Sequence, residues 1–115
     1  MEVSGRIGDG GAIRDVQYAF GDPATGADNV LVAARPAGVA IRVLAVVLMP
    51  TAAVNARFRS AANSITGLFT FGASGTLILP YNPLGWFQTN AAEALNLNLS
   101  GAVGCGVIVA WIDHV

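Results

Sequence analysis

The chain has 115 residues, of which 54% are hydrophobic and 11% are charged, whereas ordinary soluble domains hold about 45–50% and about 25%. This length predicts one domain, and a net charge of −1 with six arginines and no lysine speaks against nucleic-acid binding, which requires many neutralised phosphates. Seven of the charged residues lie within the first 28 positions, so the rest of the chain is expected to cover much of its surface with other protein.

A role within a membrane is not expected. The longest apolar run, residues 43–50, covers eight positions, far fewer than the ~20 that a membrane-spanning helix needs. Residues 1–11 lack the basic-then-apolar pattern of a secretion signal. A single cysteine, Cys105, leaves no internal disulfide to hold the fold.

The first 12 residues are rich in glycine and predict a flexible or extended N-terminal arm, followed by one β-sandwich domain over residues 13–115. In this domain period-two alternation dominates, and no amphipathic helical pattern persists over three turns. The expected strands cover residues 15–20, 29–34, 39–49, 54–60, 68–71, 76–81, 86–89, 94–100 and 106–112. Turn-forming residues separate them at short intervals. The pattern predicts an all-β fold, an antiparallel β-sandwich of jelly-roll type with about eight strands.

Two of these strands, 39–49 and 106–112, are apolar on both faces. A two-layer sandwich has one core, and each exposed Val, Leu or Ile forgoes about 1.5–3 kcal/mol of possible burial. A loop or the N-terminal arm could cover the second face, but the pattern favours copies of the chain that bury it against one another. With strict alternation, the candidate homo-oligomer interface comprises Leu44, Val46, Leu48, Ile108, Ala110 and Ile112.

The segment 93–101 alternates differently. Its leucines at positions 95, 97 and 99 are expected in the core, which places Asn96 and Asn98 on the opposite face. Neutral amides can bond across an interface without the desolvation cost of a charge, and they can equally face solvent. Both alternatives stay open, and the two asparagines join the candidate interface.

The segment 79–89, LPYNPLGWFQT, predicts a rigid turn. Pro80 cannot donate to a strand ladder and Pro83 fixes its own φ, while Gly85 permits a conformation that returns the chain to the sheet. Such a turn positions large aromatics, either hidden against protein or displayed as a receptor- or glycan-binding site. These aromatics are Tyr81, Trp86 and Phe87.

Constellations of catalytic residues are nearly absent from the sequence. The single histidine, His114, stands beside Asp113, but no nucleophile-elbow pattern accompanies them. One histidine and one cysteine cannot build a metal site, and Cys105 is expected to be a small buried apolar group. Glu93 is the only acid between Asp28 and Asp113. We therefore expect no enzymatic activity, no metal and no cofactor.

The motifs Pro80-Tyr81-Asn82-Pro83, Gly85-Trp86-Phe87 and ALNLNLS (94–100) carry a resemblance. Their order, over roughly residues 28–112, resembles a family of small virion proteins from tailed bacteriophages. The chain departs from that pattern at Cys105, within a glycine pair, and at Trp111, where tyrosine is common. The region before residue 13 has no counterpart.

The resemblance implies a structural component of a phage particle, located in the virion. We expect a jelly-roll homotrimer that acts as a capsid decoration or cement protein, with the major capsid protein among its partners. The N-terminal arm would contact the shell through Glu2, Arg6 and Asp9. The alternative, from another class, is a tail-tip or fibre receptor-binding module that recognises a host surface glycan.

Overall fold

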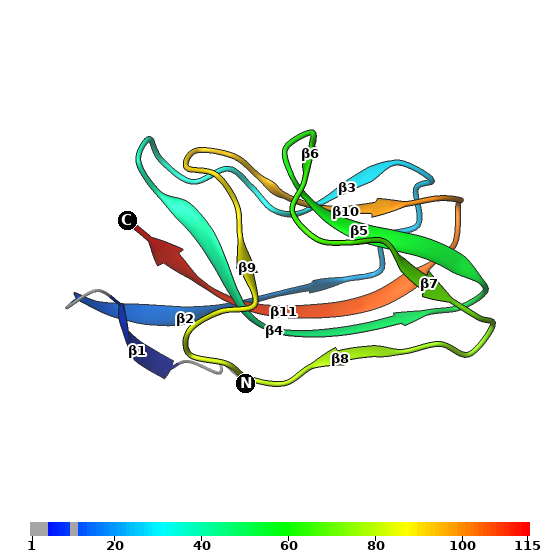
Figure 1. Ribbon diagram of the computed structural model, residues 1–115, viewed down its shortest axis with the longest axis horizontal. Coiled ribbons are helices and arrows are strands. Elements are labelled where there is room, and N and C mark those ends of the chain that lie inside the picture. Colours follow the sequence, from blue (N-terminus) through cyan, green and yellow to red (C-terminus); the bar gives the residue numbers. More distant parts are fainter. Residues whose placement is uncertain (1–4, 10–11) are drawn as a thin grey trace.

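The computed structural model describes residues 5–9 and 12–115, and every regular element in these residues is a β-strand. The strands form two antiparallel sheets that face each other; in Figure 1, β3, β10 and β5 lie above β2, β11, β4 and β8. The expectation of an all-β fold is therefore confirmed.

The six-stranded sheet has the order β1-β2-β11-β4-β8, and β9 also pairs with β4. Its strands are β1 (Gly5–Asp9), β2 (Ala12–Gly21), β4 (Ala40–Pro50), β8 (Leu77–Leu79), β9 (Phe87–Gln88) and β11 (Cys105–His114). The five-stranded sheet has the order β3-β10-β5-β6, and β7 also pairs with β5. Its strands are β3 (Asp28–Val32), β5 (Val54–Ser60), β6 (Asn63–Ser64), β7 (Phe69–Phe71) and β10 (Leu95–Leu99).

The core lies between the two sheets. Strand β5 alternates between buried and half-buried positions along its whole length, and the three leucines of β10 are fully buried. Both strands thus follow the period-two pattern of their sequence. The rings of Phe58 on β5 and Phe87 on β9 lie 4.8 Å apart, centroid to centroid, and join the two sheets.

Strand β4 departs from regular alternation through a β-bulge. Ala110 of β11 lies opposite Ala45, and Trp111, the next residue, lies opposite Val43. Leu44 is thus the extra residue on β4. A bulge of this kind moves every later side chain of its strand to the other face.

The bulge corrects the prediction for β4. Strict alternation placed Val46 and Leu48 with Leu44 on the outer face, and this placement was wrong. Both side chains lie in the core between the sheets, with at most 1% exposed. Val47 and Met49 point outward in their place and are exposed.

A second, smaller apolar cluster lies on the outer face of the six-stranded sheet. It joins Val16, Leu44, Ala110 and Ile112, all buried, and the half-buried Ile7 of β1 packs against it. The predicted arm therefore contributes a strand, β1, which pairs with β2 and covers one end of the outer face. At this end, the outer face is therefore covered by the N-terminal arm and not by another copy of the chain.

Candidate functional site

The other end of the same outer face is uncovered and carries a row of apolar side chains. Phe20 lies opposite Ile108, Ile108 opposite Val47, and Val47 opposite Ile78, across β2, β11, β4 and β8. Directly opposed residues share one face of a sheet, so the four form a continuous apolar row. Their exposed fractions are 82%, 51%, 37% and 63%, respectively.

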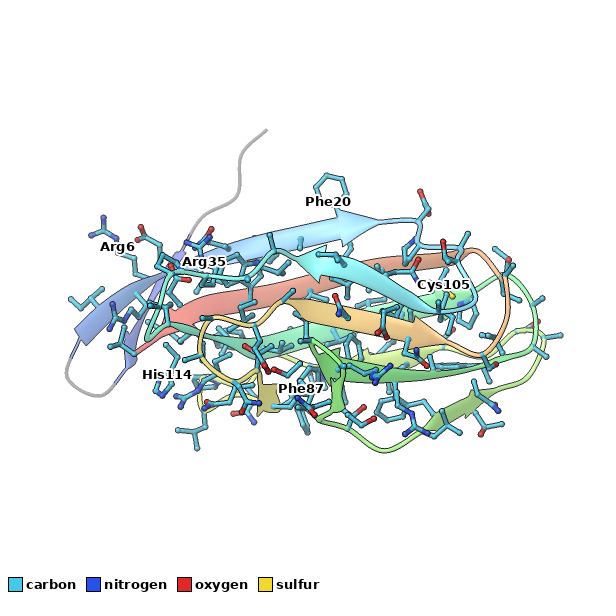
Figure 2. The ribbon with its side chains drawn as sticks, turned by 90° about the horizontal axis from the view of Figure 1, so that it is seen from above. Arg6, Phe20, Arg35, Phe87, Cys105 and His114 are labelled. Carbon is cyan, nitrogen blue, oxygen red and sulfur yellow. The ribbon has the colours of Figure 1, made fainter. Side chains whose placement is uncertain are left out.

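Tyr18 and Met49 extend this row along the strands and are also about half exposed. We call the six side chains together the apolar patch. Beside Phe20 the patch is hollowed, with a volume of about 310 Å³, and Asp22 is the one charged residue among the described residues that line the hollow. Figure 2 shows Phe20 projecting from β2, away from the rest of the chain.

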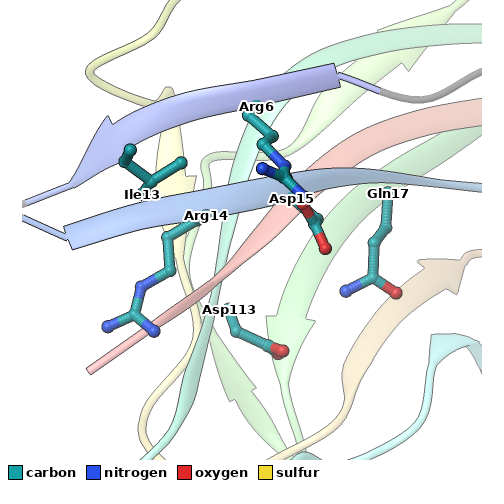
Figure 3. Close-up of a pocket in the computed structure, with 6 residues that line it drawn as sticks. All are labelled: Arg6, Ile13, Arg14, Asp15, Gln17 and Asp113. Atoms are coloured by element: carbon teal, nitrogen blue, oxygen red, sulfur yellow. The ribbon is translucent and has the colours of Figure 1, made fainter.

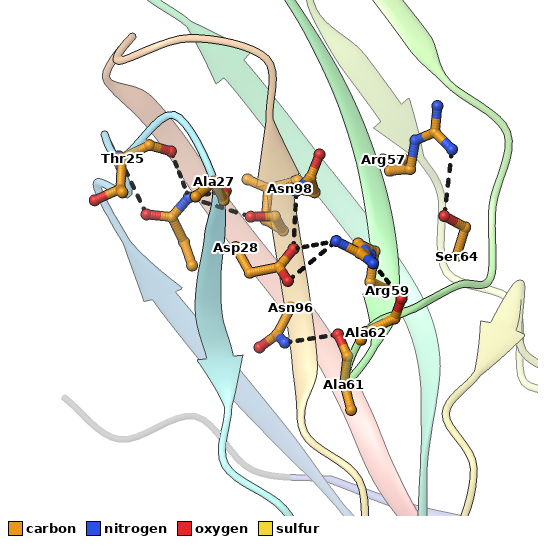
Figure 4. Close-up of polar contacts among 12 residues, drawn as sticks. Thr25, Ala27, Asp28, Arg57, Arg59, Ala61, Ala62, Ser64, Asn96 and Asn98 are labelled. Atoms are coloured by element: carbon orange, nitrogen blue, oxygen red, sulfur yellow. Dashed lines mark hydrogen bonds and ion pairs between the residues drawn. The ribbon is translucent and has the colours of Figure 1, made fainter.

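The outer face of the five-stranded sheet is polar instead (Figure 4). Arg59 donates to both carboxylate oxygens of Asp28 at 3.2 and 3.1 Å, and the Asn98 amide donates to the same carboxylate at 2.9 Å. The Asn96 amide donates to the Ala61 carbonyl at 3.0 Å. The two candidate asparagines thus face away from the core, as predicted, and their donors bond within the chain.

Two buried atoms on this polar face, Asn96 Oδ1 and Arg59 Nε, have no hydrogen-bond partner among the described residues. Unpaired polar atoms are costly to bury; Asn96 Oδ1 lacks a donor and Arg59 Nε lacks an acceptor among the described residues. The interface and solvent alternatives for Asn96 and Asn98 both remain predictions.

Hydrogen bonds hold Trp86 in place in the turn between β8 and β9. The indole N–H of Trp86 donates to the Pro80 carbonyl at 2.7 Å, and its backbone N–H donates to the Val43 carbonyl at 2.8 Å. Gly85 has φ +86°, and a Cβ added there would come within 2.6 Å of Arg42 Cγ. Glycine is therefore required at this position, for the backbone conformation and for the space.

The three aromatics of this turn have different surroundings. Phe87 is half-buried and packs on Phe58, while Tyr81 and Trp86 are exposed. A hollow of about 120 Å³ beside Trp86 is also lined by Arg42 and Gln88. The turn thus hides one ring and displays two.

The Arg42 guanidinium at this hollow is held in place. Its Nε donates to Gln88 Oε1 at 3.1 Å, and its Nη2 lies 3.0 Å from His114 Nε2. The Nε2 atom of the single histidine is therefore in contact with the Arg42 guanidinium.

The N-terminal hairpin places Arg6 2.9 Å from Asp15, and both side chains are well exposed. They line a hollow of about 440 Å³ together with residues of β2 and Asp113 (Figure 3). Of the predicted docking residues, Arg6 is on this exposed surface, Asp9 ends β1, and Glu2 lies outside the described residues.

Asp113 itself pairs with Arg35 through two hydrogen bonds of 2.6 and 3.2 Å. This bonding raises the pKa of the Arg35 guanidinium above its ordinary value. The same guanidinium lies 5.3 Å from the centre of the Trp111 ring. Asp113 is thus part of a structural ion pair at the end of β11.

The remaining reactive groups are also held in structural roles. Burial raises the pKa of the Cys105 thiol, which makes it a poor nucleophile. The Glu93 carboxylate accepts hydrogen bonds from the Ser60 hydroxyl at 2.6 Å and the Asn90 amide at 3.0 Å, and these bonds lower the pKa of Glu93.

Within residues 5–9 and 12–115, no three His, Cys, Asp or Glu side chains gather closely enough to hold a metal ion. The same residues contain no helix that is long and apolar enough to cross a membrane. Comparisons of the chain with family models, with curated proteins and with solved structures found no match.

Proposed function

We propose that this chain is a structural component of a bacteriophage particle: a subunit that forms homo-oligomers, trimers before other states, and decorates or cements the capsid. The observation that carries the proposal is the apolar patch. Proteins that act as monomers rarely leave a continuous apolar surface of this kind facing water. The resemblance of residues 80–87 and 94–100 to small virion proteins supplies the setting.

We also propose that the two sheets have jelly-roll topology. Eight strands, in chain order β2, β3, β4, β5, β7, β8, β10 and β11, make up the body. In a jelly roll, the first strand of eight neighbours the last, and the second neighbours the seventh. Here β2 pairs with β11 and β3 pairs with β10, which supports this assignment. The remaining pairs, β11–β4, β4–β8, β10–β5 and β5–β7, follow the same scheme.

Cryo-electron microscopy of the intact particle from a phage that encodes this chain would test the proposed function. The proposal predicts density for the chain on the outside of the capsid, as symmetric clusters. Density at the tail tip would favour the alternative function, and absence of the chain from purified particles would contradict both.

The alternative, a receptor-binding module at the tail, has its own supporting observation. Tyr81 and Trp86 are both exposed on this turn, and Trp86 lines a hollow together with Arg42. Aromatic faces and a fixed cation are suited to a glycan that carries a carboxylate. Loss of adsorption to host cells by a Trp86→Ala variant that still folds and assembles would favour this function.

A further inference from the structure

We propose that the apolar patch is the surface through which copies of this chain join, with Phe20 of one copy entering the hollow beside Phe20 of a neighbouring copy. This inference rests on the proposed function only in naming a second copy as the partner. Of the interface residues predicted by sequence alternation, only Ile108 belongs to this patch.

The described part of β1 covers only one end of the outer face. β1 pairs with β2 from Ala12 to Val16, and Ile7 covers the apolar cluster at that end of the outer face. The patch begins at Tyr18, where this pairing with the described part of β1 has ended.

The exposed area of the apolar patch matches one side of a small specific interface. Six large side chains, each exposing on the order of 100 Å², make a patch of about 600 Å², at the upper end of what monomers expose. Two such patches in contact would bury about 1,200 Å², which is the lower end of the range for specific interfaces. The patch is therefore large enough for a second copy to form a stable contact.

The apolar patch combines a projecting side chain with a hollow that is lined mostly by apolar residues. Phe20 projects from the sheet next to a hollow between β2, β11 and β4, lined by Val47, Met49 and Ile108. At about 310 Å³, the hollow equals the volume of roughly ten water molecules, which is enough for an aromatic ring. Projection and hollow lie on the same surface, where Asp22 is the one charged residue among the described residues that line the hollow, so Phe20 of one copy can enter the hollow of the next. Contacts between a projection and a hollow, repeated around a three-fold axis, close into a ring and leave no open surface.

Light scattering after size-exclusion chromatography, on the isolated full chain at micromolar concentration and neutral pH, would test this proposal. The variants are Phe20→Ser and Ile108→Thr. Ile13→Ser is the matched control, because Ile13 is about as exposed as Phe20 but lies near the other end of β2, away from the apolar patch. Circular dichroism verifies that each variant is folded. If Ile108→Thr does not fold, Phe20→Ser still tests the proposal, because Phe20 makes little contact within its own chain.

We expect the native chain and Ile13→Ser to form the same oligomer. Phe20→Ser and Ile108→Thr should run at the 11.7 kDa of one chain or need at least a tenfold higher concentration to assemble. A monomeric native chain, or patch variants that assemble as firmly as Ile13→Ser, would overturn the proposal. The test needs no phage particle. A chain that assembles through the patch but is absent from virions would overturn the proposed function alone.

Discussion

Leu44 and Val46 are two positions apart on β4, yet they lie on opposite faces of the six-stranded sheet. A regular strand would place them on the same face. The bulge at Leu44 separates them, and it allows Ile41, Val43, Val46 and Leu48 all to reach the core.

This relationship predicts that Val46→Asp abolishes folding. Val46 is 1% exposed in the core, and an unpaired charge there should cost more than about 3 kcal/mol. Circular dichroism and urea unfolding measure the loss. The neighbouring variant Val47→Asp is the control: it should retain the strand signal and lose assembly instead. A folded but dissociated Val46→Asp would show that Val46 faces outward.

The cover provided by β1 predicts a difference between two isoleucines of the N-terminal hairpin. Ile7→Ser should lower the free energy of unfolding by about 1–2 kcal/mol, because Ile7 is half-buried on the outer cluster. Ile13→Ser should change it by less than about 0.5 kcal/mol, since Ile13 is 74% exposed. Equal effects in urea titrations would show that β1 does not cover the sheet.

Trp86 is 44% exposed, so the loss expected for Trp86→Ala is smaller than the roughly 3–5 kcal/mol of a fully buried tryptophan. We expect about 1–2 kcal/mol, from the hydrogen bond to Pro80 and partial burial. Trp86→Phe keeps most of the ring contact and should lose about 1 kcal/mol. A loss above about 3 kcal/mol for Trp86→Ala would mean that the turn packs more tightly, against this chain or a neighbour.

The lowered pKa of Glu93 predicts that the stability of the folded chain depends on pH. Hydrogen bonds from Ser60 and Asn90 lower its pKa below the ordinary value of 4.5 in the folded chain. Its contribution is therefore fully present above pH 4.5 and is lost as the pH falls through the lower folded pKa. Between pH 6 and pH 3, the Glu93→Gln variant should lose less stability than the native chain, as measured by thermal unfolding. Parallel losses in the two proteins would contradict the role of this carboxylate.

The sequence patterns predicted the strands that have one apolar face. On β5 and β10, polar residues alternate with apolar ones and therefore indicate which side faces the core. β4 is apolar on both faces, so a bulge leaves no trace in its pattern, and Val46 and Leu48 were assigned to the wrong side. β1 was missed because its glycines indicate flexibility, while its pairing depends on β2.

The apolar patch was predicted only in part. Alternation on β11 places Ile108 outward, where it lies in the structure. Phe20, Val47 and Ile78 were missed as its neighbours, because only the pairing register of four strands that are distant in the sequence brings them into one row. A run of exposed positions on adjacent strands has no signature within any single strand.

The mass of the native chain in solution tests the central claim most directly. Light scattering across a micromolar dilution series at neutral pH should give a particle mass at least twice the 11.7 kDa of one chain. We expect the three-chain particle before other states. A particle of 11.7 kDa at every concentration would contradict the account, because the apolar patch would then face water in the native protein.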